Sequence, residues 1–386
     1  MSDWKEYKLG DIAEFRTGKL NSNAAVKNGK YPFFTCAPET FFIDDFAFDQ
    51  KAILLAGNNA EGNFNIKYYE GKFNAYQRTY VINPTHDDVD IHYLYYALQL
   101  CLKSFKVLSQ GTSTKFLTVK ILNAFNIQVP SKFVQEKIVS IIQSIDDKIE
   151  CNRRINENLE QQAQALFKSW FVDFEPFKDQ PFVESELGMI PQGWRVESLS
   201  SIADYINGLA MQKFRPEEGE KGLPVLKIKE LGQGSIDDTS ELCSPSFIGD
   251  KYIINDGDII FSWSGTLMVK VWCGGKCGLN QHLFVVNPKD YPKWFVYHWT
   301  KYHLDNFIRI AKDKAVTMGH IKRGELDKAK TVIPDNKNMQ RIDALMMPIF
   351  EQIIASELES RRLAELRDTL LPRLMSGELK VNDVDA

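Results

Sequence analysis

An internal duplication is the feature that most constrains how this 386-residue chain can fold. The pattern Trp4-x4-Leu9-x2-Ile12-Ala13 recurs as Trp194-x4-Leu199-x2-Ile202-Ala203, at an offset of 190 residues. Further along, Val81-Ile-Asn-Pro84 matches Val285-Val-Asn-Pro288 at an offset of 204, so the second copy carries 14 additional residues before position 275. The matched positions are apolar, Gly or Pro, whereas the polar residues between them mostly differ. This pattern indicates two copies of one scaffold that carry different binding surfaces.

The first part of each copy, about 1–134 and 190–338, mixes short β-like runs with turn residues. The runs at 52–56, 79–82, 258–261 and 283–286 are bounded by Gly, Asn, Asp and Pro, which predicts strands. Helices are predicted at about 92–103 and 292–308. We therefore expect an α+β fold class, with two similar globules built on curved, mainly antiparallel sheets.

The second part of each copy has the spacing of a coiled coil. Apolar and small residues recur in alternating steps of four and three from Ile138 to Trp170, and again from Ile342 to Leu374. Because the first helix leads from one globule to the other and the second must return, we expect two antiparallel helices related by a pseudo-two-fold axis. The 33 residues of the first seam would span about 50 Å, longer than the ~34–36 Å of one DNA turn.

These patterns predict four segments. They are a first globule (1–134), a helical spacer (135–175), a linker with a second globule (176–338), and a second spacer with the tail (339–386). The second copy places its Gln at position 340, one residue later than Gln135 of the first, which predicts a slightly shifted start of the second helix. The middle of the seam is polar, with Asn152 and Asn156 in one helix and Ser356 and Ser360 in the other. A buried Asn can fix the register of the pair, and an equal alternative is a seam opened for water or another protein.

Composition excludes several classes of protein. The 25 Phe, 14 Tyr and 7 Trp argue against general disorder, no apolar run reaches the ~20 residues that span a bilayer, and six dispersed cysteines predict a reducing cytoplasm. The net charge of −4 comes from the two helical segments, at −3 each, while the globules carry +2 and 0. Near-neutral globules offer few charges to a polyanion such as DNA, where neutralisation of phosphates dominates the affinity.

Motifs for catalysis or metal binding are missing from the sequence. It has no Gly-rich loop followed by Lys-Ser/Thr, no Asn/Asp-Pro-Pro-aromatic tetrad and no His-Glu-x2-His pattern. The strongest metal candidate, Cys273-Gly-Gly-Lys-Cys277 with His282, is short of the four ligands usual for zinc. The matching segment of the first copy, Glu70-Gly-Lys-Phe73, has no cysteine. We therefore predict no catalytic residue and no metal site.

If the globules bind DNA, polar residues on loops beside strands are the candidates for reading it, because Asn and Gln can pair with adenine and Arg with guanine. In the first globule the candidates are Asn58, Asn59, Gln77, Arg78, Gln110, Thr112, Ser113 and Lys115. In the second they are Lys227, Lys229, Ser262, Trp263, Thr266, Gln281, His282, Lys314 and Thr317. Lys227 and Lys229 are expected to alternate on a strand. Gln77 and Gln281 are identical in both copies, which favours a role in the scaffold or on a phosphate.

Aromatic residues gather where the first helix ends, among them Trp170 and Phe171. They either pack the helix against the second globule or dock another subunit, and packing is the favoured interpretation for most of them. The candidate subunit interface comprises Asn152, Asn156, Trp170, Phe171, Ser356 and Ser360.

The chain resembles the specificity subunits of type I restriction–modification systems over nearly its whole length. The resemblance rests on an ordered, duplicated set of strings, which includes Trp4-Lys-Glu-Tyr-Lys-Leu-Gly-Asp-Ile-Ala13, Val129-Pro-Ser-Lys-Phe-Val-Gln-Glu-Lys-Ile138, Leu166-Phe-Lys-Ser-Trp-Phe-Val-Asp-Phe174, Leu187-Gly-Met-Ile-Pro-Gln-Gly-Trp194 and Arg367-Asp-Thr-Leu-Leu-Pro-Arg-Leu-Met-Ser-Gly377. It implies two target-recognition domains that read a bipartite, asymmetric sequence in double-stranded DNA. Methyltransferase (modification) subunits, expected to number two, and restriction subunits would be the partners.

The resemblance further implies that S-adenosylmethionine, ATP and Mg²⁺ bind to those partners and that this chain binds no cofactor. The lack of a long apolar run predicts that no membrane is involved. Two other classes of function stay open at this point. A self-sufficient DNA methyltransferase would need an S-adenosylmethionine motif, which the sequence lacks. A coiled-coil adaptor that binds only proteins would retain no DNA.

Overall fold

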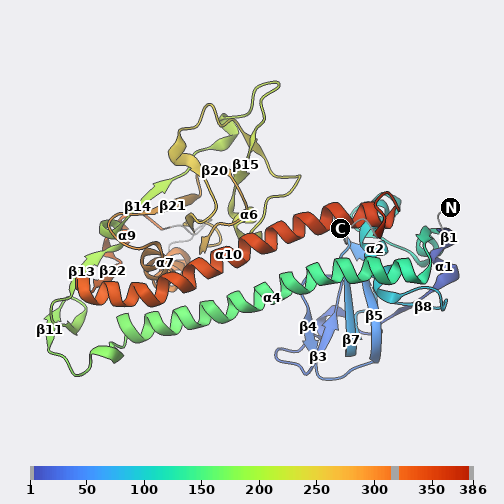
Figure 1. Cartoon of the computed structure of the whole chain (residues 1–386), viewed down its shortest axis with the longest axis horizontal. Helices are drawn as coiled ribbons and strands as arrows, with labels where there is room; N and C mark the ends of the chain where they lie inside the picture. Colours follow the sequence, from blue (N-terminus) through green and yellow to red (C-terminus); the bar gives the residue numbers. More distant parts are fainter. Residues whose placement is uncertain (1–3, 314–320, 382–386) are drawn as a thin grey trace. The chain divides into compact units, whose positions relative to one another are not determined.

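A computed structural model describes residues 4–313 and 321–381, and these separate into two compact units. Unit 1 takes its described residues from 1–147 and 364–386, and unit 2 comprises Lys148–Leu363. The two long helices, α4 (Lys132–Phe171) and α10 (Asn336–Met375), each contribute one part to each unit (Figure 1). Both predicted coiled-coil segments are therefore helical along their full length.

The first globule contains one six-stranded sheet and two separate two-stranded sheets. The strands are β1 (Lys5–Lys8), β2 (Ala13–Thr17), β3 (Tyr31–Phe34), β4 (Phe41–Ile43), β5 (Phe48–Ala56), β6 (Asn58–Asn59), β7 (Ile66–Ala75), β8 (Thr79–Pro84), β9 (Lys115–Phe116) and β10 (Asn126–Val129). The six-stranded sheet has the order β2-β8-β5-β7-β3-β4, and the two-stranded sheets are β1-β10 and β6-β9. The helices are α1 (Leu9–Ile12), α2 (Ile91–Leu108) and α3 (Val119–Ala124). The helix α2 begins where Asp90 accepts hydrogen bonds from the amides of His92 and Tyr93 at 2.8 and 3.0 Å, and it runs five residues past the predicted end.

The second globule repeats this series with additions. Its strands are β11 (Phe182–Ser185), β12 (Gly188–Pro191), β13 (Arg195–Ser198), β14 (Ala203–Asn207), β15 (Leu223–Leu226), β16 (Leu242–Cys243), β17 (Ile253–Ile254), β18 (Ile259–Ser262), β19 (Met268–Val271), β20 (Cys277–Leu279), β21 (Leu283–Pro288) and β22 (Lys330–Ile333). Its helices are α5 (Leu199–Ile202), α6 (Ile228–Gln233), α7 (Lys293–Tyr302), α8 (Leu304–Asp313) and α9 (Gly324–Lys328). The single helix predicted at 292–308 is thus two helices, α7 and α8.

Sheet topology confirms the duplication. The order β2-β8-β5-β7 of unit 1 recurs as β14-β21-β18-β19 in unit 2, and both are antiparallel throughout. One parallel pair is also shared, with Phe33 beside Asn74 in unit 1 and Val225 beside Gly278 in unit 2. The predicted α+β class with mainly antiparallel sheets is confirmed.

The register of these pairs locates the 14 additional residues of the second copy. The offset between copies is 192 at Phe33 and Val225, and 206 at Ile53 and Ile259, which pair with equivalent residues of β8 and β21. The insertion therefore lies between β15 and β18. This is where α6 and the strand β16 follow one another in the second globule.

The helix starts show how each globule holds its spacer. Both helices begin at equivalent positions, Lys132 and Asn336, so the predicted shift is wrong. Gln135 is fully buried and its amide accepts from the amide of Asp90 at 2.9 Å and donates to the carbonyls of Asp88 and Pro130. Gln340 is exposed, and the second helix is instead capped by Asp335, which accepts from the amide of Asn338 at 2.9 Å. The second copy therefore lacks the hydrogen bonds that Gln135 makes in the first, but its helix starts at the equivalent position.

Within each unit the segments of α4 and α10 run antiparallel and share the core of a globule. In unit 1, Ile138 and Ile142 of α4 pack in one hydrophobic cluster with Leu371 and Leu374 of α10. An ion pair at 2.9 Å joins Arg367 to Asp146, and Asp146 also accepts from the hydroxyl of Tyr96 at 2.8 Å. In unit 2, Phe167 and Phe171 of α4 share a cluster with Ile342 and Met346 of α10. The predicted seam is therefore also the core of both globules.

No helix in the described ranges is both long and apolar enough to cross a membrane.

Candidate nucleic-acid interface

Three predicted loops of the first globule come together in the structure. The short strand β6 pairs with β9, which places Asn58 beside Phe116 and Asn59 beside Lys115. Gln110 exchanges two backbone hydrogen bonds with Phe116, at 3.1 and 2.7 Å. Since the chain separates these loops by about 50 residues, their convergence comes from the tertiary fold.

The third loop joins them through Arg78. The amide of Gly57 donates to the carbonyl of Arg78 at 2.8 Å, and a Cβ at Gly57 would lie 2.5 Å from that oxygen, so this close approach requires glycine. The guanidinium of Arg78 lies over the ring of Phe116, 5.0 Å from its centroid. A cation over an aromatic face is attracted to it, so Phe116 holds Arg78 at the edge formed by these loops.

Gln77 is placed by a different contact. Its side-chain amide donates to the Asn21 side chain at 2.7 Å, and its backbone amide donates to the carbonyl of Leu20 at 2.9 Å. The residue thus ties the loop after β2 to the turn before β8. This arrangement supports the scaffold role among the two that were predicted for Gln77.

The remaining candidates of the first globule differ in how far their side chains are available to an external ligand. Asn59 is committed to its own loop, since its side-chain oxygen accepts from the amides of Glu61 and Asn63 at 2.9 and 3.0 Å. The side-chain oxygen of Asn58 is buried without a protein partner. Gln110, Thr112 and Ser113 are exposed. An exposed loop beside a fixed Arg and Lys115 provides both donors for base edges and charge for phosphates.

The matching edge of the second globule has different chemistry. The hydroxyl of Ser264 is 3.0 Å from Nδ1 of His282, and the indole nitrogen of Trp263 donates to Asn207 at 2.9 Å. The side-chain amide of Gln281 lies 3.4 Å from Nε2 of His282, and Thr266 is exposed. The interface candidates of this globule therefore centre on a half-buried Trp and His, with no arginine in the equivalent place.

Several predicted residues are placed differently by the fold. Ser262 is fully buried and its hydroxyl donates to the carbonyl of Ser264 at 3.2 Å, which removes it from the candidate surface. Lys227 and Lys229 do not alternate on a strand: Lys227 precedes α6 and Lys229 lies within it. The side chain of Glu230 accepts from the backbone amide of Lys227 at 3.2 Å and so favours the start of a helix there. Lys314 and Thr317 lie outside the described residues.

Lys227 and Lys229 both form ion pairs with carboxylates. Lys227 forms an ion pair with Glu241 at 2.8 Å, and Lys229 forms one with Asp237 at 2.9 Å. The same lysine donates to the hydroxyl of Thr239 at 3.2 Å. Neutralised in this way, the two charges are weaker candidates for phosphate contacts than Lys115.

Three of the four polar residues in the middle of the helices, Asn152, Asn156 and Ser356, are buried within unit 2, and Ser360 is half-buried. Asn152 is 1% exposed and donates to Glu359 at 2.8 Å and to the carbonyl of Ser356 at 3.5 Å. Asn156 donates to Glu357 at 2.9 Å and to the carbonyl of Ile353 at 3.3 Å. The serine hydroxyls are not the partners, since Ser360 donates within its own helix, to the carbonyl of Ser356. These contacts support the register role of the two Asn residues.

Trp170 and Phe171 belong to the largest cluster of buried aromatic residues. They are 7% and 2% exposed and pack against Phe177, Trp194 and Trp294, with ring centroids 5.6 to 6.2 Å apart. Burial supports packing between helix and second globule. A contact of these two rings with another subunit stays a prediction.

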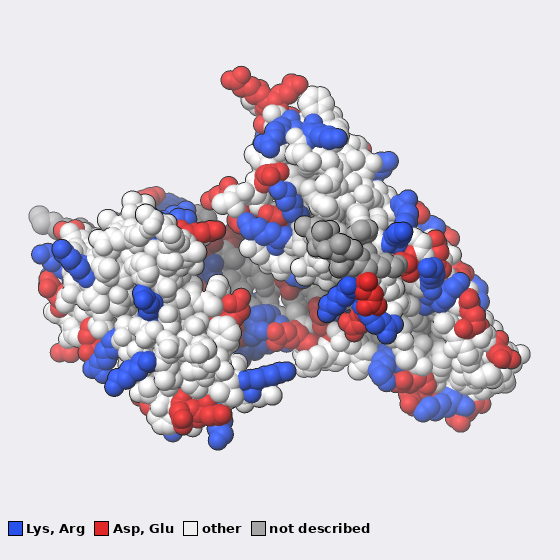
Figure 2. All heavy atoms as spheres, turned by 180° about the vertical axis from the view of Figure 1, so that it is seen from behind, with Lys and Arg blue, Asp and Glu red and all other residues white. Residues whose placement is uncertain are grey.

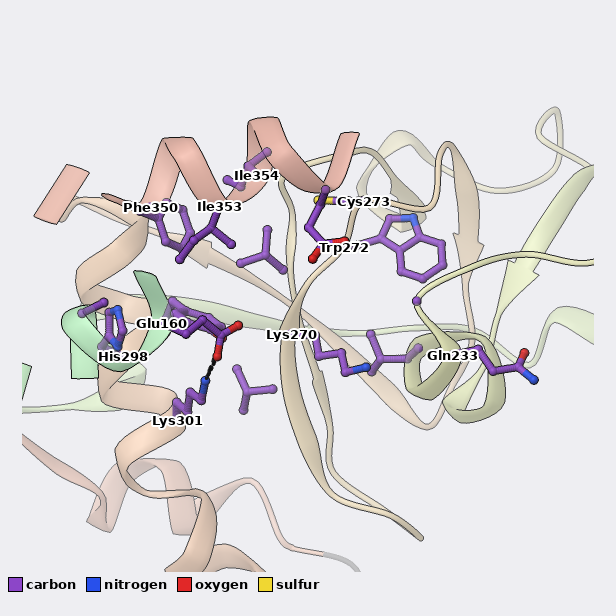
Figure 3. Close-up of a pocket in the computed structure, with 17 residues that line it drawn as sticks. Glu160, Gln233, Lys270, Trp272, Cys273, His298, Lys301, Phe350, Ile353 and Ile354 are labelled. Carbon is purple, nitrogen blue, oxygen red and sulfur yellow. Dashed lines mark hydrogen bonds and ion pairs between the residues drawn. The ribbon is translucent and has the colours of Figure 1, made fainter. Parts of the chain in front are cut away.

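A cavity of about 400 Å³ lies in unit 2 between the two helices and the second globule (Figure 3). Glu160 and Lys301 form an ion pair across it at 2.9 Å, and Lys301 donates to the hydroxyl of Tyr297 at 3.2 Å. Burial lowers the pKa of His298 to about 3 and raises the pKa of the Cys273 thiol to about 12. At neutral pH the imidazole is therefore uncharged and the thiol protonated, so neither group is activated.

Within 4–313 and 321–381, no group of three or more His, Cys, Asp or Glu side chains is placed as metal ligands would be. Cys243 of β16 and Cys277 of β20 are buried, and burial raises the pKa of both thiols. Thiols that stay protonated pack as small apolar side chains. The absence of a bound metal remains a prediction.

Charge is dispersed over the face shown in Figure 2, where Lys and Arg alternate with Asp and Glu on both units. This agrees with near-equal numbers of basic and acidic residues, 47 and 51. A face without a broad basic patch offers few phosphate contacts, and these dominate the affinity of proteins for DNA.

Phe116 is the functional candidate that the sequence did not reveal. It follows directly on Lys115, the last residue of a predicted loop, but nothing in the spacing places its ring under Arg78. The same holds for Asn207, which receives the indole N–H of Trp263 from a strand 56 residues away. In both cases the partner comes from a distant segment, so only the fold could identify it.

Comparison with known proteins gives a consistent set of relatives. The family model of the type I restriction modification DNA specificity domain matches residues 1–161 and 191–368. The chain is 32% identical over 313 residues to the type I restriction enzyme MjaIX specificity subunit of Methanocaldococcus jannaschii, which covers 77% of this chain and 71% of that protein. It is 26% identical to the HindI specificity subunit of Haemophilus influenzae, over 98% of this chain and the full length of that protein.

The fold is also similar to a crystal structure of the S subunit of a type I restriction–modification system from M. genitalium. The TM-score is 0.61 with 16% sequence identity, and the match covers 97% of this chain and 96% of that one. At this identity the likeness concerns the fold alone. The two halves of the family match leave a gap between 161 and 191, where the first helix ends and the second globule begins.

Proposed function

Because the chain belongs to the family of type I restriction modification DNA specificity domains, we propose that it reads a bipartite, asymmetric DNA site and catalyses no reaction itself. Membership of the family makes it a DNA-recognition subunit of a type I restriction–modification complex. In the proposal the first globule, residues 1–134, reads one half-site and the second, within 176–338, reads the other. The spacers 135–175 and 339–386 would relate the two globules by a pseudo-two-fold axis.

One observation carries this proposal above the others. The two globules share the strand order β2-β8-β5-β7 and β14-β21-β18-β19, yet differ in the side chains on the loops at the ends of these strands. A shared scaffold would present both loop sets to DNA in the same way. Different side chains at equivalent places would then select different bases, which yields an asymmetric site.

The chemistry of modification and cleavage is assigned to partner subunits. The complex would hold modification subunits, two in our proposal, and restriction subunits, with S-adenosylmethionine, ATP and Mg²⁺ bound to these partners. The dispersed charge of this chain supports the division, because a near-neutral reader needs partners to add phosphate contacts. A cytoplasmic location belongs to the same proposal and is supported by the six free cysteines.

Family membership does not favour the two competing functions. A self-sufficient methyltransferase would bind the methyl donor, so equilibrium dialysis of the purified chain with S-adenosylmethionine is expected to show no binding. A coiled-coil adaptor would retain no DNA at any salt concentration. Saturable binding of the methyl donor would overturn the non-catalytic assignment.

The test of the main proposal is recognition by the assembled complex. The full chain, purified with its modification subunits, is expected to shift a duplex that carries the motif methylated in the host genome, as read by modification-sensitive sequencing. A duplex with a scrambled motif serves as the control. Exchange of residues 1–134 for another such globule should change one half-site and leave the other intact. Absence of sequence-specific binding, or a change in both half-sites, would contradict the proposal.

A further inference from the structure

The turn that precedes the central strand is built the same way in both units. In unit 1 the amide of Thr79 donates to the carbonyl of Tyr76 at 2.8 Å. In unit 2 the amide of Leu283 donates to the carbonyl of Asn280 at 3.0 Å. The two turns are separated by 204 residues at both ends. The backbone at this point is therefore common to the two copies.

A second hydrogen bond fixes the residue before each strand. The carbonyl of Arg78 accepts from the amide of Gly57 at 2.8 Å, and the carbonyl of His282 accepts from the amide of Trp263 at 3.4 Å. The register of the central strands makes Gly57 equivalent to Trp263 and Arg78 equivalent to His282. One anchored position of the scaffold thus carries Arg in the first globule and His in the second.

The surroundings of this position differ as sharply as the residue itself. Arg78 is exposed, lies over the ring of Phe116 and forms no ion pair with any residue in the described ranges. Phe116 is held in turn by its pairing with Asn58 and Gln110. A cationic fork that is pre-ordered and has no carboxylate partner is suited to an acceptor outside the chain.

In the second globule the equivalent His282 is satisfied by its neighbours. Its Nδ1 lies 3.0 Å from the hydroxyl of Ser264 and its Nε2 lies 3.4 Å from the side-chain amide of Gln281. The ring of Trp263 is tilted beside it, with the centroids 6.4 Å apart. A neutral or singly bonded imidazole offers at most one directed contact, unlike the two parallel donors of an arginine.

We propose that Arg78 determines specificity at one base pair of the first half-site by contacting a guanine in the major groove, with Phe116 acting as its positioning residue, and that the equivalent His282 makes no such contact in the second half-site. The inference rests on the proposed function and names the residue that carries it. Two parallel N–H groups match O6 and N7 of guanine, and this is the commonest specific contact to a base. His282 cannot make that bidentate contact, so the second half-site lacks a guanine at the equivalent place.

A base contact is favoured over a phosphate contact by the way the position varies. Gln77 and Gln281, one residue earlier, are identical in the two copies and at least Gln77 is engaged with the scaffold. The residue that follows them changes while the backbone does not. A contact to phosphate carries no sequence information, and the same cation would serve it in both globules.

The test is selection from a randomised duplex pool by the full chain in complex with its modification subunits, followed by sequencing of the bound fraction. Wild type is expected to yield two half-sites, one with an invariant guanine. Arg78→His should lose the guanine preference at that single base pair, with roughly 10- to 100-fold weaker binding to the guanine site. Arg78→Lys should retain the dependence on salt but relax the preference. His282→Arg should introduce a guanine into the other half-site.

Phe116 is tested by a matched pair of variants. Phe116→Leu removes the ring and is expected to relax discrimination at the same base pair, whereas Phe116→Tyr keeps the ring and should preserve it. Circular dichroism and thermal unfolding of each variant monitor folding, and Arg78→Lys, at an exposed side chain, should match wild type.

Three outcomes would overturn the inference, and the third would also overturn the proposed function. If Arg78→His weakens all duplexes equally and leaves the selected consensus unchanged, Arg78 contacts phosphate. If the guanine preference disappears with a variant at another position but not with those at Arg78, the reading residue is elsewhere. If wild type itself selects no consensus, the proposed function fails as well, so the two failures are distinguishable.

Discussion

The two units hold the ends of the long helices with different side chains on the same scaffold. The end of α4 enters unit 2 with three aromatic residues, and the end of α10 enters unit 1 with aliphatic ones. At positions 204 residues apart, the pairs are Phe167 and Leu371, Trp170 and Leu374, and Phe171 and Met375. All are buried, so one helix position tolerates either chemistry if the facing core changes with it. The comparison teaches that duplication has kept the backbone while both core and edge have diverged.

The largest effect is expected from shortening these anchors. Phe171→Ala should lower the free energy of unfolding by about 3–5 kcal/mol, because it removes a ring that contacts Trp194, Trp294 and Phe295. Met375→Ala, at a flexible side chain that is 9% exposed, should cost about 2 kcal/mol. Hydrogen exchange should rise in β13 and α7 for the first variant and in β1 and α1 for the second. Equal losses, or exchange confined to the wrong unit, would break the comparison.

The next prediction concerns the pH dependence of the stability of unit 2. His298 is buried in unit 2, and the equivalent residue of unit 1 is Leu94. Burial lowers the pKa of His298 to about 3, whereas an unfolded His titrates near 6.5. The unfolded state therefore binds the proton first, so stability is full above pH 6.5 and falls by about 1 kcal/mol per pH unit between 6 and 4.

The variant His298→Leu adopts the residue of the other copy and supplies the control. It should unfold with less pH dependence between 6 and 4 than wild type. Tryptophan fluorescence is a suitable probe, since six of the seven Trp residues lie in 148–363. Identical slopes for wild type and variant would show that this imidazole does not govern acid sensitivity.

A smaller effect concerns the polar seam of unit 2. Asn152→Leu breaks the bond to Glu359 at 2.8 Å and should cost about 1–2 kcal/mol. Asn156→Leu loses a similar bond but also removes a buried side-chain oxygen that has no protein partner, so its cost should be within about 1 kcal/mol. Urea unfolding of the two variants measures the difference. A larger loss for Asn156→Leu would mean that its oxygen is satisfied, as it would be by an ordered water.

The smallest effects are expected from replacing single lysines at the candidate interfaces, Lys229 in the second globule and Lys115 in the first. Lys229→Met removes an exposed ion pair to Asp237 and should change stability by no more than about 0.5 kcal/mol, with unchanged DNA affinity. Lys115→Met, on β9 beside Asn59, should weaken binding to all duplexes and reduce the salt slope by about one. Titrations at several salt concentrations test both, and a salt effect of Lys229→Met alone would reverse the assignment.

Much of the fold could be predicted because the spacing of apolar residues along the chain indicates helices and strands. The steps of four and three residues predicted the two long helices. The runs at 52–56, 79–82 and 283–286 lie within strands, and the run at 258–261 begins one residue before β18. The predicted strand at 227–229 was wrong because one side chain, that of Glu230, caps a helix there. A single capping contact is not visible in a pattern of alternating residues.

The candidate site was predictable only in part. The sequence identified the loops around Asn58, Arg78 and Gln110, but not that they meet. It also included Ser262, which the fold buries, and it did not indicate Phe116. Strand pairing between segments some 40 to 60 residues apart depends on the whole sheet, and a residue on a strand end can face the core or the edge.

By itself, the sequence determined that this chain is a duplicated scaffold with two long helices of coiled-coil spacing, because periodicity and repetition are properties of the chain alone. The tertiary structure decided which polar residues share one edge, which are buried and which are paired with carboxylates. The physical reason is that burial and hydrogen bonding are set by neighbours from distant segments. Arg78 and His282 are conspicuous as alternatives only once their backbones are seen to occupy the same anchored turn.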